Sequence, residues 1–310
     1  MSLANYKPPL TKASDFKTFW DKRRETSVPL AKIDWQDHYP VKQVKVADVT
    51  LICRDGTPIR SWMILPNTKQ KQIPAVIHFP GYTAGRGAIH EFLKYALMGV
   101  AVFCFEPRGQ GISPDRAAYS RGNFLPGWMA TDLENLENYY YVHVYEDMLT
   151  YLSWIKGLGC IDLERIAVMG ESQGGGIALA AAGLDTDIKL VISDFPFLSH
   201  IEKGLELASG GPYVEVAHYF KYNDPKRDSY QQVMRNLSYV DAMNFCPDIL
   251  CHALMSIGMK DTVTPPETVF AAYNHLASPT KEIDIYPDYG HEPNPFKEER
   301  RLEIIAQYLL

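Results

Sequence analysis

The sequence predicts an α/β fold in which helices flank a mostly parallel central sheet. The main signal is a series of short, nearly continuous apolar runs, at residues 73–79, 99–106, 164–170, 189–195, 252–258 and 281–287. Helical patterns lie between some of these runs, at 139–157 and 266–276. Strands that are apolar on both faces are typical of a parallel sheet, because helices cover both faces of such a sheet.

The N-terminal part of the chain departs from this alternation. Residues 1–40 predict a helical extension, with an amphipathic helix at 14–25 that Ser14 would cap. Residues 43–65 alternate apolar and polar side chains around an Asp-Gly pair at 55–56. This pattern predicts an antiparallel hairpin at one edge of the sheet.

Two long stretches interrupt the rest of the pattern. Residues 111–138 are rich in Gly, Pro, Asp and aromatic residues and predict a long excursion from the core. Residues 197–245 predict a helical insertion after the sixth core strand, when the two hairpin strands are counted. Segments this long in a compact domain are usually functional. The length of 310 residues suits one large domain, so we expect residues 1–310 to form a single unit.

Composition excludes several classes of protein. The formal net charge of −6 leaves no basic surplus to neutralise phosphates, so we expect no nucleic-acid partner. No apolar run approaches the roughly 20 residues that span a bilayer, and the first residues lack the apolar core of a signal peptide. We therefore expect no membrane association. The five cysteines are scattered without metal-site spacing, which favours a cytoplasmic protein without a bound metal.

The stretch "MGESQGGG" at 169–176 predicts an abrupt turn from a strand into a helix, with Ser172 at its tip. Gly170 and Gly174 lack a Cβ, so strand and helix can approach closely around the serine. This G-x-S-x-G arrangement is the nucleophile elbow of the α/β-hydrolase fold. The alternative is a glycine-rich turn in which Ser172 only caps the following helix.

An elbow serine needs a general base and an acid that orients the base, because a hydroxyl alone is a poor nucleophile. In α/β-hydrolases these residues follow in the order serine, acid, histidine. Asp261 follows the strand expected at 252–258, and His291 follows the strand expected at 281–287. Both loops lie at the carboxyl ends of strands, where parallel sheets place their ligands. We therefore predict that Ser172, Asp261 and His291 are catalytic.

Other residues remain as alternatives for the base. Four further histidines follow the serine, two in the insertion and two within a predicted strand or helix: His200, His218, His252 and His275.

Asp194 is the alternative for the acid, because it also ends a predicted strand. Asp261 is favoured because its loop precedes the last helix of the pattern and must reach the loop of His291. Asp284 should alternate with isoleucines inside a strand, and the Glu171 side chain should point away from the tip of the elbow.

Two backbone N–H groups are candidates for the oxyanion hole. One belongs to Gln173, the residue after the nucleophile, and the other to Tyr82 in the loop "HFPGYTAGRG". The alternative for this loop is an ordinary Pro-Gly turn.

Three stretches resemble the signature blocks of the acetyl xylan esterase and cephalosporin-C deacetylase family, carbohydrate esterase family seven. They are "EPRGQGIS" at 106–113, "GESQGGG" at 170–176 and "GHEP" at 290–293. The likeness extends from about residue 10 to the C-terminus and includes "FPGYTAGRG", "DFPFLSH", "LSYVDAMNF" and "GMKDTVTPPETVFAAYNHL". The sequence departs from the family pattern in three places. Glu171 differs, "PNPF" follows the His-Glu pair, and part of the excursion differs.

The resemblance assigns the catalytic roles to Ser172, Asp261 and His291, and the oxyanion donors to Tyr82 and Gln173. It also implies three further roles. Arg108 and Gln110 would brace the active-site loops, and Pro212 would line a small acyl pocket, together with Tyr82.

The resemblance further implies a ring-like hexamer, a trimer of dimers. Three aromatic residues that look exposed, Trp62, Phe124 and Trp128, give this expectation modest support from the sequence.

The sequence therefore predicts a serine carboxylesterase that removes acetyl groups from small acetylated sugars such as xylo-oligosaccharides, and from related acetate esters such as cephalosporin C. It would need no cofactor. Two alternatives stay open. One is another α/β-hydrolase activity, such as a peptidase or a broad short-chain esterase, and the other is a catalytically silent binding protein on the same scaffold.

Overall fold

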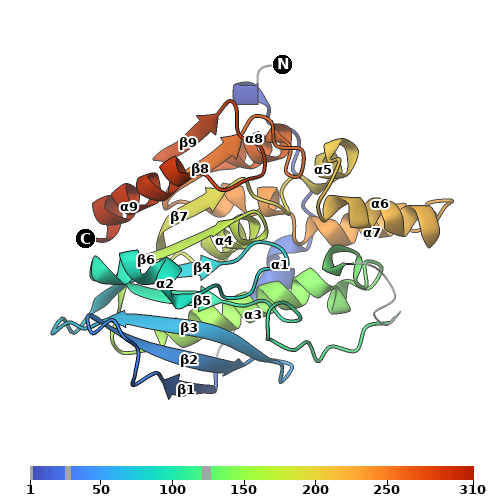
Figure 1. Ribbon diagram of the computed structural model, residues 1–310. Coiled ribbons are helices and arrows are strands. Elements are labelled where there is room, and N and C mark those ends of the chain that lie inside the picture. Colours follow the sequence, from blue (N-terminus) through green and yellow to red (C-terminus); the bar gives the residue numbers. More distant parts are fainter. Residues whose placement is uncertain (1–2, 25–28, 121–126) are drawn as a thin grey trace.

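The computed structural model describes residues 3–24, 29–120 and 127–310. Over these residues the chain forms a nine-stranded sheet with the strand order β1-β2-β3-β5-β4-β6-β7-β8-β9 (Figure 1). The strands are β1 (Ala31–Trp35), β2 (Val44–Ile52), β3 (Pro58–Pro66), β4 (Ile73–Phe79), β5 (Ala101–Phe105), β6 (Ile161–Glu171), β7 (Ile188–Asp194), β8 (His252–Gly258) and β9 (Lys281–Tyr286).

All six apolar runs form the strands of the parallel part of the sheet, so the predicted fold class is confirmed. Strands β4 to β9 pair only in parallel with one another, whereas β3 joins β5 in an antiparallel pair. Every residue of β5 and β8 is buried. Strands buried on both faces explain why their sequences do not alternate.

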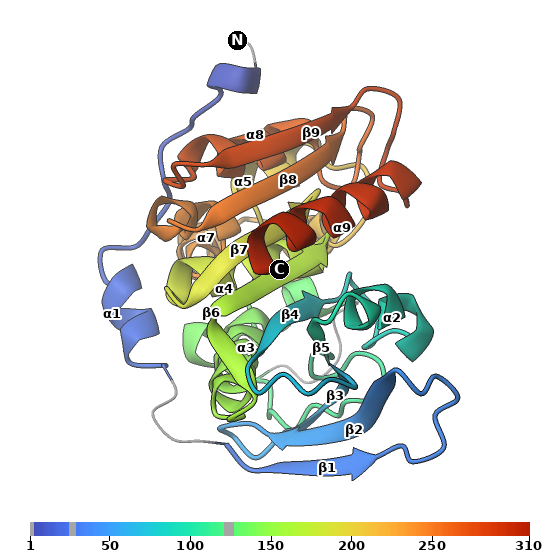
Figure 2. The same ribbon diagram turned by 90° about the vertical axis from the view of Figure 1, so that its left-hand side faces the viewer.

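Helices cover both faces of the sheet, and each face has its own apolar core. On one face lie α2 (Ile89–Leu97) and α9 (Pro295–Leu309), and Figure 2 shows α9 in front of the strands. The other face packs against the larger core, which includes α1 (Phe16–Asp21), α3 (Tyr140–Lys156), α4 (Gln173–Leu184) and α8 (Pro266–His275).

The N-terminal region differs from the prediction. The short 3₁₀ helix η1 (Leu3–Asn5) and α1 are helical, but residues expected to belong to a helical extension form β1, which pairs antiparallel with β2. The predicted hairpin is β2–β3, and β1 covers its outer side, so the antiparallel region has one strand more than expected. The predicted cap is also wrong, because α1 has Asp15 rather than Ser14 at its N-cap position. β1 has only five residues, and their apolar and polar side chains alternate weakly, so the sequence gives little indication of a strand there.

The excursion and the insertion meet at one end of the molecule, at the right of the sheet in Figure 1. The described part of the excursion holds two 3₁₀ turns, η2 (Trp128–Ala130) and η3 (Leu136–Asn138). The insertion contains α5 (Ile201–Leu207), α6 (Tyr213–Tyr222), α7 (Tyr230–Ser238) and η4 (Ala242–Asn244), and η5 (Cys246–Asp248) follows it. Because β1 adds a strand, the insertion follows the seventh strand of the chain.

The aromatic residues expected to be exposed pack against their own chain where they are described. The Trp62 ring stacks against the guanidinium of Arg86, 3.6 Å from the ring centroid, and the Trp128 ring contacts the Tyr82 ring at 5.2 Å. Phe124 lies outside the described residues. Among the helices that the structure describes, none has the length and apolarity needed to cross a membrane.

Candidate active site

The elbow around Ser172 has the strained geometry that its glycines predict. β6 ends at Glu171, α4 begins at Gln173, and Ser172 between them has φ 53° and ψ −118°. A Cβ on Gly174 would lie 1.9 Å from the carbonyl oxygen of Phe79, and one on Gly170 would lie 2.4 Å from Gly174. Only glycines permit this approach. The Ser172 side chain makes no capping hydrogen bond to α4, so the capping alternative does not describe its role.

The structure brings the three predicted catalytic side chains together. The Ser172 hydroxyl oxygen lies 3.1 Å from His291 Nε2, and His291 Nδ1 lies 2.8 Å from Asp261 Oδ2. The Asp261 side chain is fully buried, whereas the His291 side chain is 23% exposed. The carboxylate is thus shielded from water, while the imidazole is partly exposed.

The loop after β8 fixes the orientation of the Asp261 carboxylate. Oδ1 accepts the backbone N–H groups of Val263 and Thr264, both at 2.8 Å. Oδ2 accepts the Thr264 hydroxyl at 2.8 Å and faces His291. Each oxygen therefore has a defined set of donors, and Oδ2 is the one that meets the imidazole.

The alternative histidines lie elsewhere. His200 precedes α5, His218 is exposed on α6, and His252 lies in β8, where its ring stacks on Tyr308. His275 ends α8 and contacts the carbonyl oxygen of Pro8. In the described part of the chain, His291 is the histidine with a hydrogen bond to Ser172.

Asp194 and Glu171 belong to a charged cluster behind the elbow. The Asp194 carboxylate accepts Arg301 Nε at 2.9 Å and also contacts the Ser256 hydroxyl. The Glu171 carboxylate lies 2.8 Å from Lys297 Nζ, so its side chain points away from the tip of the elbow, as expected. Burial favours the neutral acid, but the charges of Lys297 and Arg301 outweigh it and lower the pKa of Glu171 to about 2. Asp284 lies in β9, 3.7 Å from Arg300.

The two proposed oxyanion donors belong to loops that hydrogen-bond to each other. The Gln173 side-chain amide donates to the carbonyl oxygens of Pro80 and Gly81, both at 3.3 Å, and pairs with the Gln110 amide. Gln110 Oε1 also accepts the N–H of Thr83 at 3.1 Å. Within the described residues, the backbone N–H groups of Tyr82 and Gln173 have no hydrogen-bond acceptor.

Arg108 sits at the centre of a buried ion cluster beneath these loops. Its guanidinium donates to Asp147 at 2.7 and 2.6 Å and to Asp55 at 2.7 Å. Burial raises the pKa of Asp55, but hydrogen bonds from Arg108 outweigh this effect and the pKa falls to about 2. The carbonyl oxygen of Arg108 accepts the Tyr140 hydroxyl, which in turn contacts Gln110. Arg108 and Gln110 thus connect the turn between β2 and β3, α3 and the elbow.

Aromatic residues lie next to the elbow on the side of the insertion. The N–H of Phe197 donates to the Ser172 carbonyl oxygen at 2.9 Å, and the Phe197 ring contacts both Tyr213 at 4.6 Å and Tyr82 at 6.2 Å. Pro212, which is buried, is the N-cap residue of α6 just before Tyr213.

Several contributors to the site escape prediction from sequence. Phe197 contacts the elbow through its backbone, and the Phe195 ring lies edge-on to the His291 ring at 4.7 Å. Both belong to the stretch "DFPF" after β7, and that position at a strand end is the signal that could have drawn attention to them. Glu215, which contacts Tyr82, has no such signal because it lies inside a helix.

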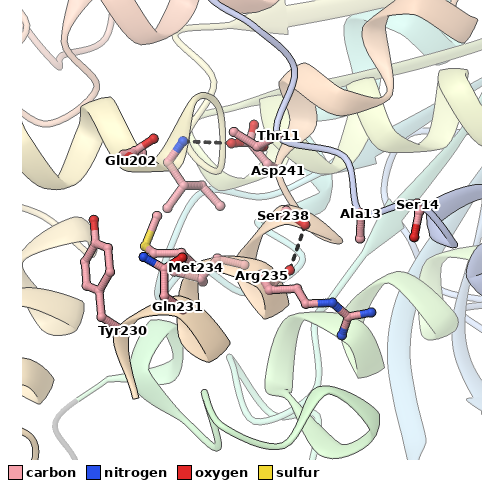
Figure 3. Close-up of a pocket in the computed structure, with 12 residues that line it drawn as sticks. Thr11, Ala13, Ser14, Glu202, Tyr230, Gln231, Met234, Arg235, Ser238 and Asp241 are labelled. Carbon is pink, nitrogen blue, oxygen red and sulfur yellow. Dashed lines mark hydrogen bonds between the residues drawn. The ribbon is translucent and has the colours of Figure 1, made fainter. Parts of the chain in front are cut away.

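A separate cavity of about 360 Å³ lies between the N-terminal segment, α5 and α7 (Figure 3). Its lining includes Thr11, Glu202, Tyr230 and Asp241, and none of the predicted site residues. The described residues contain no group of three or more His, Cys, Asp or Glu side chains arranged to hold a metal ion.

Comparison with known proteins places the chain in a family. The family model for acetyl xylan esterase (AXE1) matches residues 1–308. The structure is similar to that of an acetyl xylan esterase from Paenibacillus sp. R4, with 42% identity, a TM-score of 0.95 and coverage of 99% of this chain and 98% of the other. It is also similar to acetyl xylan esterase 1 from Thermoanaerobacterium sp. JW/SL YS485, with 31% identity, a TM-score of 0.92 and the same coverage.

More distant relatives share less sequence identity with this chain. The acetyl esterase Axe7A of Xylanibacter ruminicola is 26% identical over an alignment of 296 residues, and the match covers 92% of this chain and 65% of that protein. The chain thus spans just under two thirds of the length of this relative. The α/β hydrolase GrgF from Penicillium sp. sh18, at 18% identity and a TM-score of 0.58, shares the fold, with coverage of 85% of this chain and 99% of that one. Taken with the strand order and the elbow, the match over residues 1–308 shows that the chain belongs to the acetyl xylan esterase family.

Proposed function

We propose that this protein is a serine carboxylesterase that removes acetyl groups from small acetylated sugars such as xylo-oligosaccharides, and from related acetate esters such as cephalosporin C. The observation that carries the proposal is the hydrogen-bonded series Ser172–His291–Asp261, with distances of 3.1 and 2.8 Å, in a member of the acetyl xylan esterase family.

In the proposed reaction, the Ser172 hydroxyl oxygen attacks the acetyl carbon while His291 Nε2 takes its proton. The imidazolium then donates that proton to the departing sugar oxygen, which leaves an acetyl group on Ser172. A water molecule, deprotonated by His291, attacks this ester; His291 then returns the proton to the Ser172 oxygen, and acetate is released. Asp261 holds the proton of His291 on Nδ1 and stabilises the imidazolium. The reaction uses no metal or organic cofactor.

The N–H groups of Tyr82 and Gln173 would stabilise the negative charge on the carbonyl oxygen in the transition state. Donors of this kind contribute most when they are fixed before the reaction, and removing one typically costs about 100- to 1000-fold in kcat. The amide pair of Gln110 and Gln173 supports such a role, because it ties the elbow to the loop of Tyr82.

A preference for acetyl over longer acyl groups follows from the groups around the serine. We propose that Tyr82 and Pro212 close the acyl pocket, with Phe197 between Tyr82 and the start of α6. Forcing extra methylenes into a rigid site typically costs about 1–3 kcal/mol, which corresponds to roughly 5- to 150-fold in rate.

We also propose that the protein is cytoplasmic and forms a homo-oligomer. The family resemblance implies that this oligomer is a hexamer. All five cysteines are free thiols, which suits a reducing compartment. The hexamer rests on the resemblance alone, because Trp62 and Trp128 contact their own chain.

The experiment is a measurement of acetate released from acetylated xylo-oligosaccharides and cephalosporin C, with Ser172→Ala as the control. A series of p-nitrophenyl esters from acetate to octanoate gives the acyl preference. We expect turnover of the sugar esters, acetate as the best acyl group, and labelling of Ser172 by a fluorophosphonate. An optimum at butyrate or octanoate would contradict acetyl esterase activity, and absence of both turnover and labelling would indicate a silent scaffold.

A further inference from the structure

The carboxylate of Glu215 joins three segments that lie far apart in the sequence. Glu215 is in the first turn of α6, and its two oxygens accept the Tyr82 hydroxyl at 2.8 and 2.9 Å. Oε2 also accepts the backbone N–H of Met129 at 2.9 Å. The Tyr82 hydroxyl in turn accepts the N–H of Trp128 at 2.7 Å. The loop after β4, the excursion and the insertion therefore meet at this carboxylate.

The backbone around the carboxylate is shaped to admit it. Gly127 has φ 93°, and a Cβ at this position would lie 2.0 Å from the Glu215 carboxylate. No other residue type could occupy position 127 without displacing Glu215. Burial raises the pKa of Glu215 to about 7.

The Tyr82 ring is held at both of its ends. Its hydroxyl is bound by Glu215 and Trp128, while its backbone belongs to the loop that hydrogen-bonds to Gln173 next to Ser172. Between these ends the ring contacts Trp128 at 5.2 Å and Phe197 at 6.2 Å, both with edge-to-face geometry. A tyrosine fixed in this way is a rigid wall, because rotation of its ring away from Phe197 would break the hydrogen bonds of its hydroxyl.

We propose that Glu215 determines acyl-chain selectivity by fixing the Tyr82 ring as a wall of the acyl pocket beside Ser172. This inference rests on the proposed esterase function and extends it. Glu215 is a positioning residue, since it acts through Tyr82 and contacts neither His291 nor Ser172. Its removal frees the ring to turn and opens the pocket to longer acyl groups.

The test is the ratio of kcat/KM for p-nitrophenyl butyrate to that for p-nitrophenyl acetate. In Glu215→Ala we expect this ratio to rise by about 5- to 150-fold, which is the reverse of the penalty that a rigid pocket imposes. Tyr82→Phe keeps the ring and removes the hydroxyl, so it should raise the ratio in the same direction. The double variant should show little more than the larger single effect, because both changes break the same contact.

Two further variants separate this role from a loss of folding. Glu206→Gln removes a carboxylate of α5 that pairs with Lys203 at the surface, and it should leave the ratio unchanged. Glu215→Gln keeps the size and one acceptor oxygen, so it should raise the ratio above that of wild type, though by less than Glu215→Ala. It therefore tests the proposal even if the alanine variant does not fold. Thermal melting identifies the folded variants.

An unchanged ratio in folded Glu215→Ala and Glu215→Gln, or additive effects in the double variant, would overturn the role of Glu215 and leave the esterase function intact. A wild-type protein that hydrolyses neither ester would overturn both proposals.

Discussion

Replacement of Asp261 by asparagine tests the proposed chemistry most directly, because the structure dictates how the new amide would lie. Oδ1 accepts two backbone N–H groups, from Val263 and Thr264, at 2.8 Å each. The amide oxygen must take this position, since an NH2 group there would face two donors. The NH2 group is then forced into the position of Oδ2, 2.8 Å from His291 Nδ1.

This orientation gives His291 the wrong tautomer. The amide donates to Nδ1, so the imidazole carries its proton on Nε2, which faces the Ser172 hydroxyl at 3.1 Å. A protonated Nε2 cannot accept the serine proton. The same substitution in a Ser-His-Asp triad lowers kcat by about 10⁴-fold, or about 5.5 kcal/mol of transition-state free energy, and we expect a similar loss here. Both hydrogen bonds at the Oδ1 position remain, and only the one from the Thr264 hydroxyl to Oδ2 must rearrange, so stability should change modestly.

Asp194→Asn is the matched control. Asp194 is also buried and also ends a strand, but its carboxylate contacts Arg301 and Ser256 rather than His291. Weakening a buried ion pair is costly for folding, so we expect a loss of up to about 3 kcal/mol in the free energy of unfolding. Because the Asp194 backbone oxygen that accepts the Ser172 N–H is unchanged, kcat should fall less than about tenfold.

The assay is the steady-state kcat for p-nitrophenyl acetate, normalised to the fraction of active serine by fluorophosphonate titration, with urea unfolding of each variant. A larger loss of kcat in Asp194→Asn than in Asp261→Asn would refute the reasoning and assign the acid to Asp194.

Four further predictions concern the triad, the ion pair of Glu171, metal ions and assembly. Ser172→Ala and His291→Ala should each reduce kcat for p-nitrophenyl acetate to below a few per cent without loss of the fold, because triad members act as a unit; substantial residual turnover would mean that the nucleophile or base is wrong. Because the pKa of Glu171 falls from 4.5 to about 2 on folding, its contribution to stability is complete above pH 4.5 and is lost as the pH falls toward 2. The melting temperature of Glu171→Gln should therefore depend less on pH in that range than that of wild type, and parallel curves would contradict the ion pair with Lys297. Treatment with EDTA should leave turnover unchanged, whereas a loss that one added metal restores would argue for a metal enzyme. Light scattering should give a mass of six subunits, as the family resemblance implies, and a monomer would exclude the hexamer.

The parallel core and the elbow could be predicted from sequence because local physical rules determine them. Strands buried on both faces need continuous apolar runs, and the close approach at Gly170 and Gly174 tolerates no Cβ. Once those strands are placed, Asp261 and His291 must emerge at the same edge of the sheet as Ser172. Chain order and topology therefore identify three residues that are up to 119 positions apart.

The remaining parts of the site depend on contacts that no local pattern encodes. Glu215 is an ordinary helical glutamate until the fold brings Tyr82 and the excursion to it. Trp62 and Trp128 look exposed in the sequence because their partners, Arg86 and Tyr82, come from other segments. The strand β1 is missed for a related reason, since most of its stabilisation comes from pairing with β2.

Two departures from the family pattern meet behind the elbow, and this explains why they coexist with an intact triad geometry. The run "PNPF" begins α9, because the Asn294 side chain caps the helix by accepting the N–H of Phe296 at 2.9 Å, and Pro295 is the first helical residue. This start places Lys297 in the first turn of the helix, where its ammonium lies 2.8 Å from the Glu171 carboxylate.

The same ammonium lies over the Phe195 ring at 4.4 Å, and that ring contacts the His291 imidazole. Glu171 and Lys297 thus form one ion pair on the face of the sheet opposite α4, and the helix start at 294–296 positions the lysine. Because Glu171 ends the strand that precedes the nucleophile, the pair stabilises the elbow. Through the Phe195 ring, it also supports the His291 imidazole. In the proposed function, the excursion and the insertion, which meet at Glu215, are the segments we expect to contact the substrate.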